Sequence, residues 1–288
     1  MSARPIGLIA NARKPGAREL VTKLVEEFAR RKREVVLERR TAELIETDSE
    51  AAAADLARDC ELLVVLGGDG TILQVLHELD DRRCPIFGIN LGSLGFLTSV
   101  SSADWLKAVE RIVEGKYLTS ERTVLTVELI RDGKLVSTGH ALNDAVISRG
   151  ELSRLIKLEV SIDGEPLTEY NADGLIVATP TGSTAYSLSA GGPVLSPDSG
   201  VFVVTPICPH VLTMRPVIVS DASRIEIAPA RRERDVFVTL DGQHSESVKA
   251  GDLLRISKAP YRLSIAMLSG MSFFEVLRQK LKWSGSAI

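Results

Sequence analysis

Apolar residues in the first third of the chain alternate between short continuous runs and one-sided helical spacing. Four continuous runs predict short strands, at residues 5–10, 34–38, 61–66 and 85–90. Four segments with apolar residues on one side predict helices, at residues 17–33, 49–59, 71–79 and 102–115. Ser49 is the expected N-cap of the second helix. Run 61–66 lacks polar alternation, which is typical of a strand buried on both faces of a parallel sheet. The alternation of strands and helices predicts a doubly wound, Rossmann-like α/β domain.

The pattern changes near residue 120, where short alternating strands surround turn sequences. "RDGK" at 131–134 and "DG" at 163–164 predict hairpin turns, and helical spacing is scarce as far as residue 268. The tail at 272–283 is again amphipathic, and such a helix needs a surface to cover. We therefore expect an α/β domain at 1–118, joined by a C-terminal helix within 270–288 that returns to it, and a β-rich domain at 119–269.

Composition narrows the class of protein. The 288 residues are 44% hydrophobic and 25% charged with a net charge of −3, which is typical of a globular protein. The basic runs at 30–33 and 231–234 are interpreted as solvated surface, so neither nucleic acid nor a membrane is an expected partner. The start of the chain lacks the apolar core of a signal peptide, and no apolar run reaches membrane-spanning length. A cytoplasmic protein is the expectation.

Cysteine and histidine do not indicate a metal site. The three cysteines are far apart and form no CxxC pair, and the four histidines are scattered. Neither a disulfide framework nor a zinc site is expected from such spacing.

The sequence "GGDG" at 67–70 places one carboxylate among three glycines, between a buried strand and a helix. Ligands gather at the carboxyl ends of parallel strands, and a helix N-terminus favours phosphate. Glycines let the backbone approach an anion closely. Asp69 repels phosphate, so it is expected to act on a hydroxyl group or near Mg²⁺. The alternative is a tight turn in which Asp69 caps the helix, and four residues alone do not decide.

Three further stretches combine polar residues with flanking strands. The sequence "NLGSLGFL" at 90–97 is either a ligand-binding loop or an ordinary turn. The pair "ND" at 143–144 either binds ribose hydroxyls or marks a β-bulge or strand end. "TPTGSTAYSLSAGG" at 179–192 is the most specific stretch, because hydroxyl residues, an aromatic and glycines stand together between apolar strands. A helix is expected to begin near Ser183, and Tyr186 could stack on a base.

The order of these motifs, ending in "DGQ" at 241–243, resembles the bacterial NAD kinases over nearly the whole chain. The stretch at 179–193 is nearly diagnostic, whereas "GGDG" is shared with phosphofructokinases and with diacylglycerol and sphingosine kinases. The resemblance implies transfer of the γ-phosphate of ATP to the 2′-hydroxyl of the adenosine ribose of NAD, giving NADP and ADP in NADP biosynthesis. It also implies Mg²⁺ or another divalent cation carried by ATP, no metal ligands in the protein, and a homo-oligomer, either a dimer or a tetramer.

The resemblance also implies roles for individual residues. Asp69 matches the proposed general base, and Gly67, Gly68 and Gly70 match the loop that meets phosphate. Asn143 and Asp144 match a pair that holds NAD, although many members have Glu at the second position, and Asn171 replaces a basic residue of many relatives. The complete set of implied NAD contacts is Asp69, Gly70, Asn143, Asp144, Arg154, Asn171, Asp173, Thr181, Thr184, Ala185, Tyr186, Ser189 and Gln243.

Two other functions fit parts of the sequence. A lipid or sugar kinase of the same superfamily would share the glycine loop but not the stretch at 179–193. A sensor that binds NAD(P)(H) without turnover would have little use for a carboxylate beside phosphates. Both are therefore weaker hypotheses than an NAD kinase.

Overall fold

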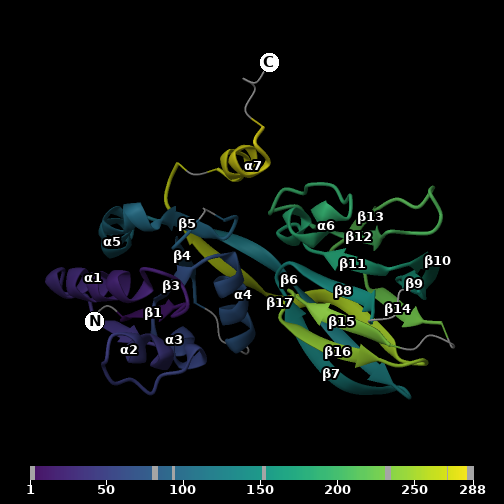
Figure 1. The fold of residues 1–288 in the computed structure, drawn as a ribbon, viewed down its shortest axis with the longest axis horizontal. Coiled ribbons are helices and arrows are strands. Elements are labelled where there is room, and N and C mark those ends of the chain that lie inside the picture. Colours follow the sequence, from purple (N-terminus) through teal and green to yellow (C-terminus); the bar gives the residue numbers. More distant parts are fainter. Residues whose placement is uncertain are drawn as a thin grey trace. The chain divides into compact units, whose positions relative to one another are not determined.

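The computed structural model describes residues 4–79, 84–92, 95–150, 154–230, 235–270 and 272–283. The chain forms two compact units, which Figure 1 draws as a ribbon. The first unit comprises residues 1–121 and 263–288, and the second comprises 122–262. The domain boundaries expected after residues 118 and 269 lie at the start of strand β6 and beyond strand β17, whereas the units divide inside both strands.

The first unit is an α/β structure around a parallel sheet. Its strands are β1 (Ile6–Ala10), β2 (Val35–Leu37), β3 (Leu62–Gly67), β4 (Ile86–Asn90) and β5 (Thr98–Ser101). Its helices are α1 (Ala17–Arg30), α2 (Arg39–Leu44), α3 (Ala53–Asp59), α4 (Asp69–Glu78), the 3₁₀ turn η1 (Ser102–Asp104), α5 (Trp105–Val113) and α7 (Phe273–Leu281). The sheet order is β2-β1-β3-β4, and both β5 and the last residues of β17 pair with β4. Every residue of β3 is buried, as the continuous apolar run predicted.

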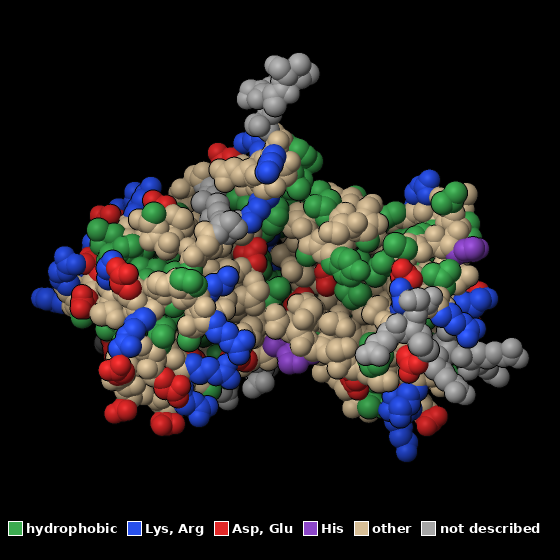
Figure 2. All heavy atoms as spheres, in the orientation of Figure 1, with side chains coloured by type: hydrophobic (Ala, Val, Ile, Leu, Met, Phe, Trp, Pro, Cys, Tyr) green, Lys and Arg blue, Asp and Glu red, His purple; other side chains and the backbone are tan. Residues whose placement is uncertain are grey.

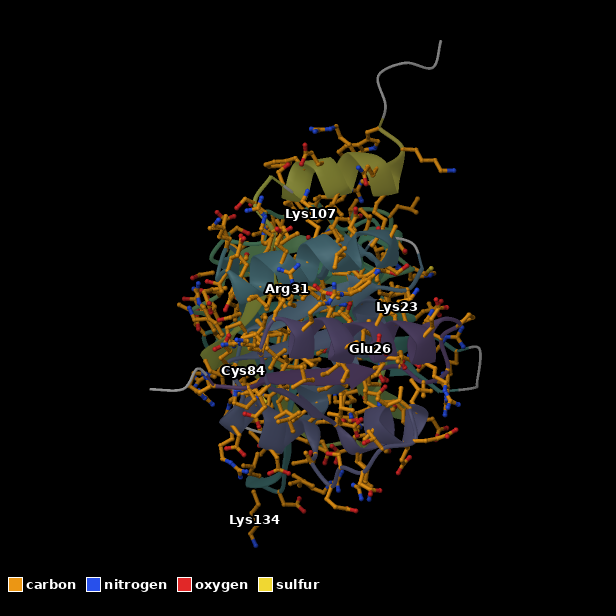
Figure 3. All side chains as sticks on the ribbon, turned by 90° about the vertical axis from the view of Figure 1, so that its left-hand side faces the viewer. Lys23, Glu26, Arg31, Cys84, Lys107 and Lys134 are labelled. Atoms are coloured by element: carbon orange, nitrogen blue, oxygen red, sulfur yellow. The ribbon has the colours of Figure 1, made fainter. Side chains whose placement is uncertain are left out.

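Helix α1 shows how the apolar spacing builds the core of this unit. Leu20, Leu24 and Phe28 lie on one side of the helix and are buried in the cluster that also contains the sheet residues. Lys23 and Glu26 lie on the exposed side, which faces the viewer in Figure 3. The helix therefore covers one face of the sheet and presents charge to water.

The basic run at 30–33 is part of this charged surface. Arg30 and Arg31 both form ion pairs with Glu27, and Arg33 pairs with Glu61. Lys, Arg, Asp and Glu side chains are interspersed over the part of this unit drawn in Figure 2. The interpretation of the run as solvated surface holds for Arg30, whose side chain is 73% exposed, but not for Arg33, whose side chain is 15% exposed. The other basic run, at 231–234, lies outside the described residues.

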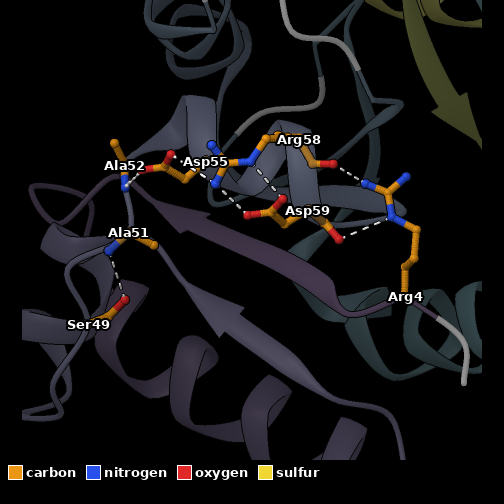
Figure 4. A network of polar contacts seen from close by, with 7 residues as sticks. All are labelled: Arg4, Ser49, Ala51, Ala52, Asp55, Arg58 and Asp59. Carbon is orange, nitrogen blue, oxygen red and sulfur yellow. Dashed lines mark hydrogen bonds and ion pairs between the residues drawn. The ribbon is translucent and has the colours of Figure 1, made fainter.

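The predicted cap of the second helix is wrong. Helix α3 begins at Ala53, and the Ala52 N–H donates to the Asp55 carboxylate at 3.2 Å (Figure 4). The Ser49 hydroxyl instead donates to the Leu37 carbonyl at 2.6 Å and accepts the N–H of Ala51. Ser49 thus holds the loop between two helices, because a hydroxyl can satisfy any nearby backbone group.

The far end of α3 is anchored to Arg4, which stands two positions before β1. The Arg4 guanidinium donates to the backbone carbonyls of Arg58 and Asp59, which are the last carbonyls of the helix (Figure 4). A cation at a helix C-terminus also suits the helix dipole.

The C-terminal helix α7 packs on the first unit. Ser272 caps it by accepting the N–H of Glu275, while the Glu275 carboxylate accepts the Ser272 N–H. Val276 and Leu277 are buried, and the ring of Phe273 lies 6.0 Å from that of Phe96. The return of this helix to the α/β unit was predicted from its amphipathic pattern and is confirmed.

The second unit is rich in β-structure. Its strands are β7 (Lys134–Ala141), β8 (Asp144–Arg149), β9 (Ile156–Ile162), β10 (Glu165–Ala172), β11 (Gly174–Ala178), β12 (Val201–Ile207), β13 (Val217–Ser220), β14 (Ile225–Pro229), β15 (Val236–Leu240) and β16 (His244–Val248), with most of β6 (Leu118–Arg131) and β17 (Leu253–Met267). Its helical turns are η2 (Gly182–Thr184) and α6 (Tyr186–Ser189).

Two layers of strands enclose the core of the second unit. One sheet has the antiparallel order β13-β12-β11-β8-β15-β16, and β10, β9, β14 and β17 follow one another in the other. Apolar residues from both sheets form a single buried cluster that includes Ile147, Tyr170 and Phe202. Alternating apolar positions on these strands supply that core.

The turn sequences have the backbone conformation that hairpins require. Asp132 and Gly133 both have positive φ, at 50° and 74°, and Asp163 and Gly164 have φ of 52° and 86°. Positive φ at both central residues matches the right-handed twist of the flanking strands. The predicted hairpins β6–β7 and β9–β10 are confirmed.

We expect Phe28→Ala to lower the free energy of unfolding of the first unit by about 3–5 kcal/mol, because it leaves a cavity at a fully buried site. Phe274→Ala is the matched control, since its ring is 58% exposed, and should cost less than about 1 kcal/mol. Urea unfolding measures both. Equal losses in the two variants would contradict the packing described for α1.

Candidate functional site

The predicted residues fall into two groups, one in each unit. The first group surrounds the end of β3, where Gly67 closes the strand and Asp69 opens helix α4. The strand–loop–helix context predicted for "GGDG" is therefore confirmed. The N-terminal N–H groups of α4 lie at the carboxyl edge of the parallel sheet, where ligands of open α/β sheets bind.

The Asp69 carboxylate does not cap its own helix. One oxygen accepts the N–H of Phe96 at 2.8 Å and the other accepts the N–H of Leu97 at 3.1 Å. A Cβ atom at Gly95 would lie 1.9 Å from an Asp69 oxygen, so only glycine allows this approach. The two loops that the sequence analysis treated separately are thus joined by Asp69.

The second loop is also held from within. The Asn90 side chain accepts the N–H of Gly92 at 2.6 Å and donates to the Thr98 hydroxyl at 3.1 Å. That hydroxyl accepts the N–H of Gly95 at 2.9 Å. Residues 93 and 94 of this loop lie outside the described residues. The described part is a fixed turn that aims two N–H groups at Asp69.

A pocket of about 390 Å³ lies beside the glycine loop, at the end of β1, and sequence reasoning missed it. Arg13 and Arg40 contribute positive charge to its lining, and Glu38 and Glu78 contribute negative charge. The Asn11 amide, which also lines it, donates to the Thr71 hydroxyl of α4 at 3.3 Å. The sequence signal for this pocket was the position of Asn11, which directly follows a strand of the parallel sheet, where ligands of such sheets bind.

The second group of residues is built around the segment Leu142–Asp144, which leads into β8. The Asp241 carboxylate accepts three backbone N–H groups of this segment, at 2.9 Å from Leu142, 2.7 Å from Asn143 and 3.1 Å from Asp144. The Asp241 N–H in turn donates to the Asp144 carbonyl at 3.0 Å. Sequence reasoning assigned the "DGQ" motif to Gln243 and missed Asp241, whose position in a motif was the only signal.

The loop after β11 holds the same segment from its other side. The Thr179 hydroxyl donates to the Leu142 carbonyl at 2.5 Å, and the Thr179 N–H donates to the Asn143 carbonyl at 2.9 Å. A Cβ atom at Gly182 would lie 1.9 Å from the Asn143 carbonyl oxygen. The glycine in "TPTGS" is therefore required for close packing of two backbones.

Asp144 is 4% exposed and carries the most perturbed carboxylate of this group. Burial, together with the negative charge of Asp241, raises the pKa of Asp144 to about 7, and a hydrogen bond from the Tyr186 N–H opposes the rise. The carboxyl group of Asp144 therefore changes charge near neutral pH. Asp144 is also the first residue of β8, as one of the two interpretations predicted.

The remaining residues of the stretch at 179–189 line the same loop. Thr181 is buried, and its hydroxyl has no hydrogen-bond partner among the described residues. The Thr184 hydroxyl donates to the Thr181 carbonyl at 3.2 Å. Tyr186 and Ser189 are exposed. The helix expected to begin near Ser183 is present as two short turns, η2 and α6, which a non-helical backbone at Ala185 separates.

Asp173, predicted with the others, lies at the opposite end of β8 from Asp144. Register pairs Ala178 with Asp144, and Asp173 stands five positions before Ala178, so Asp173 lies roughly 16 Å from the Asp144 end at the rise of a strand. Asp173 has a polar partner there, since Arg149 Nε donates to its carboxylate at 2.8 Å.

Three further predicted residues are not joined to the Leu142–Asp144 segment by the hydrogen bonds described above. The Asn171 carbonyl accepts the His210 N–H at 2.8 Å, and Arg154 and Gln243 are exposed. Their roles in binding stay predictions.

The described residues contain no cluster of three or more acidic, His or Cys side chains that could hold a metal ion. In the same part of the chain, no helix is both long enough and apolar enough to span a bilayer.

A glycine loop with one carboxylate at the head of a helix, and a second unit that carries a buried acid and a hydroxyl-rich loop, suit a nucleotide-dependent phosphotransferase. The ATP-NAD kinase N-terminal domain family matches residues 6–117, and the ATP-NAD kinase C-terminal domain family matches residues 142–268. The chain belongs to the NAD kinase family, and its function is that of an NAD kinase.

Whole-chain relatives agree with this assignment. The NAD kinase of Geotalea daltonii is 44% identical over 97% of this chain and 99% of its own length, and that of Solibacter usitatus is 40% identical over 96% of both. A yeast NADH kinase structure in complex with NADH superposes with a TM-score of 0.90 at 26% identity, covering 99% of this chain and 89% of that one. An Archaeoglobus fulgidus NAD kinase structure in complex with ATP gives 0.76 at 27% identity, covering 97% and 100%.

The raised pKa of Asp144 predicts a pH-dependent stability. Between the ordinary carboxyl pKa and about 7 the folded state keeps a proton that the unfolded state releases, so stability falls as pH rises through this window. Asp144→Asn removes this dependence. Wild type should lose roughly 2–3 kcal/mol of its free energy of unfolding between pH 5 and pH 8 through this group, and Asp144→Asn should not. Denaturant unfolding at both pH values measures it, and a constant difference would contradict the described environment.

Proposed function

We propose that Asn143 and Asp144 bind the adenosine ribose of NAD and that Asp69 orients its 2′-hydroxyl for attack on the γ-phosphorus of ATP. The 2′-oxygen forms a bond to phosphorus, the bond from phosphorus to the bridging oxygen breaks, and ADP leaves. The observation that carries the proposal is the single carboxylate of the glycine loop, whose two oxygens are fixed by the N–H groups of Phe96 and Leu97.

Asp69 suits a late proton acceptor. A carboxylate is a weak base for an alcohol, but the hydroxyl proton becomes acidic once its oxygen begins to bond to phosphorus. Two fixed hydrogen bonds leave each Asp69 oxygen a further lone pair for this proton. General-base assistance of this kind contributes roughly 10²–10⁴-fold to the rate.

The phosphates of ATP are proposed to meet the glycine loop. Gly67, Gly68 and Gly70 bring backbone close to the ligand, and the N-terminus of α4 provides N–H groups and partial positive charge. The positive charges of Arg13 and Arg40, which line the adjoining pocket, suit the negative charge of these phosphates. The Archaeoglobus relative was solved with ATP and the yeast relative with NADH, which supports these two ligand classes for this chain.

A divalent cation, Mg²⁺ or another, is proposed to arrive with ATP and to screen its phosphate charges. Asp69 is the acid in the glycine loop, and its free lone pairs could contact water molecules of the cation's shell. Its alternative role is therefore to position the cation, with the hydroxyl proton passing to solvent.

The adenine side is proposed to lie against the loop at 181–189. Thr181, Thr184, Ala185, Tyr186 and Ser189 belong to this loop, and the exposed Tyr186 ring can stack on a base. The other proposed NAD contacts are Gly70, Arg154, Asn171, Asp173 and Gln243.

We also propose a homo-oligomer, a dimer or a tetramer, in the cytoplasm, where NAD and ATP are available. Exposed apolar side chains on the second unit support an interface with another copy of the chain. Val211 is 45% exposed, Leu212 88% and Ile218 50%. Burying such side chains between copies would remove apolar area from water.

The activity is tested with ATP, Mg²⁺ and NAD⁺, reading NADP⁺ with an NADP-specific dehydrogenase. We expect wild type to form NADP⁺ and Asp69→Asn to lose at least about 10²-fold in kcat while its KM for NAD stays within a few-fold. Thermal unfolding of both proteins controls for the loss of one loop hydrogen bond. Near-normal turnover by a folded variant would remove Asp69 from the mechanism.

The stacking role of Tyr186 is tested by Tyr186→Ala. We expect the KM for NAD to rise roughly tenfold with kcat little changed, because stacking contributes equally to ground state and transition state. Leu135→Ala, which removes another exposed apolar side chain of this unit, should leave both constants unchanged. An unchanged KM in Tyr186→Ala would leave Tyr186 a surface residue only.

A further inference from the structure

Asp241 stands in the turn between β15 and β16 and is 7% exposed. Its φ is 50°, and the following Gly242 has φ of 65°. Burial of a carboxylate is costly unless hydrogen bonds replace its water. The three N–H groups of Leu142, Asn143 and Asp144 supply those bonds.

These contacts act on the one stretch of backbone from which two proposed ligand residues project. Asp241 Oδ1 accepts from both Asn143 and Asp144, and its Oδ2 accepts from Leu142. The N–H of Asp241 returns a bond to the carbonyl of Asp144. Charge-assisted bonds are shorter and stronger than neutral ones, and three of them to one carboxylate fix the course of this backbone.

We propose that Asp241 is a positioning residue for NAD: its carboxylate fixes the Leu142–Asp144 backbone and so sets the directions of the Asn143 and Asp144 side chains. It acts without touching the ligand, and the inference rests on the proposed function of those two residues. Gln243, two positions on, is the member of the same motif proposed to touch NAD itself.

Asp241 has a second effect on Asp144, through charge. Asp241 faces Asp144 from the β15–β16 turn, and the Tyr186 N–H faces it from α6. Burial and the Asp241 charge together raise the pKa of Asp144 to about 7. An ionised carboxylate accepts bonds from two ribose hydroxyls, so NAD binding favours the charged form. The KM for NAD should therefore fall as pH rises through about 7.

The test is Asp241→Asn, which keeps the shape of the side chain but removes its charge and at least one acceptor. At pH 8 we expect the KM for NAD to rise about tenfold, the scale of one charge-assisted hydrogen bond, with the KM for ATP unchanged. The pH at which the KM for NAD rises should also shift below the wild-type value. A purely structural role would lower thermal stability without raising the KM for NAD of the folded variant at pH 8.

Asp163→Asn is the matched control. Asp163 has a φ of 52° in the "DG" turn between β9 and β10, and its carboxylate accepts the Arg224 N–H at 2.8 Å. This variant should change stability at most, with both KM values and the pH profile as in wild type. A folded Asp241→Asn protein that behaves in the same way would overturn the proposal.

Thr179→Val keeps the proposal testable if Asp241→Asn does not fold. It removes the hydroxyl that donates to the Leu142 carbonyl on the other side of the segment and leaves the Asp241 charge in place. We expect a raised KM for NAD with an unshifted pH profile. An unchanged KM for NAD in this variant would contradict positioning through the segment. Wild-type protein that forms no NADP⁺ would instead refute the proposed function, which separates the two failures.

Discussion

Carboxylates that accept backbone N–H groups hold the functional loops of both units. Asp69 accepts two such groups from the loop at 95–97, and Asp241 accepts three from Leu142–Asp144. Loops at strand ends leave N–H groups without a partner, and an ionised carboxylate is the strongest acceptor available to them. The acids in the motifs therefore organise the backbone as well as any ligand.

This constraint explains why glycines accompany the acids. Side-chain oxygens can reach a neighbouring backbone only if no Cβ intervenes, as at Gly95, where a Cβ would lie 1.9 Å from Asp69. Gly182 satisfies the same requirement against the Asn143 carbonyl. Each motif thus pairs a hydrogen-bond acceptor with a glycine that lets the acceptor approach. Changing either residue displaces the other.

The fold class follows from the sequence because hydrophobic spacing and turn chemistry are local. Run 61–66 predicts β3, and the "DG" pairs predict hairpins, since Asp163 and Gly164 adopt the positive φ that such turns need. Helix α2 was missed because six residues show too little apolar periodicity. Its cap, Glu38, is recognisable only from its bond to the Thr41 N–H.

The candidate residues were predictable in kind, but their connections were not. The link from Asp69 to Phe96 spans 27 positions and that from Asp241 to Asn143 spans 98, so no local pattern reveals either. Residue types and flanking strands indicate the motifs, whereas the residue roles come from a family resemblance, which gives the role in "DGQ" to Gln243. The structure adds Asp241, because only tertiary contacts show which backbone a buried carboxylate holds.

A crystal structure of the protein with NAD bound tests the account most directly. We predict that the adenosine ribose hydroxyls lie within about 3.2 Å of the Asp144 carboxylate or the Asn143 side chain. The three bonds to Asp241 should remain as they are without ligand. Ribose bound elsewhere, with Asn143 and Asp144 out of its reach, would contradict the account.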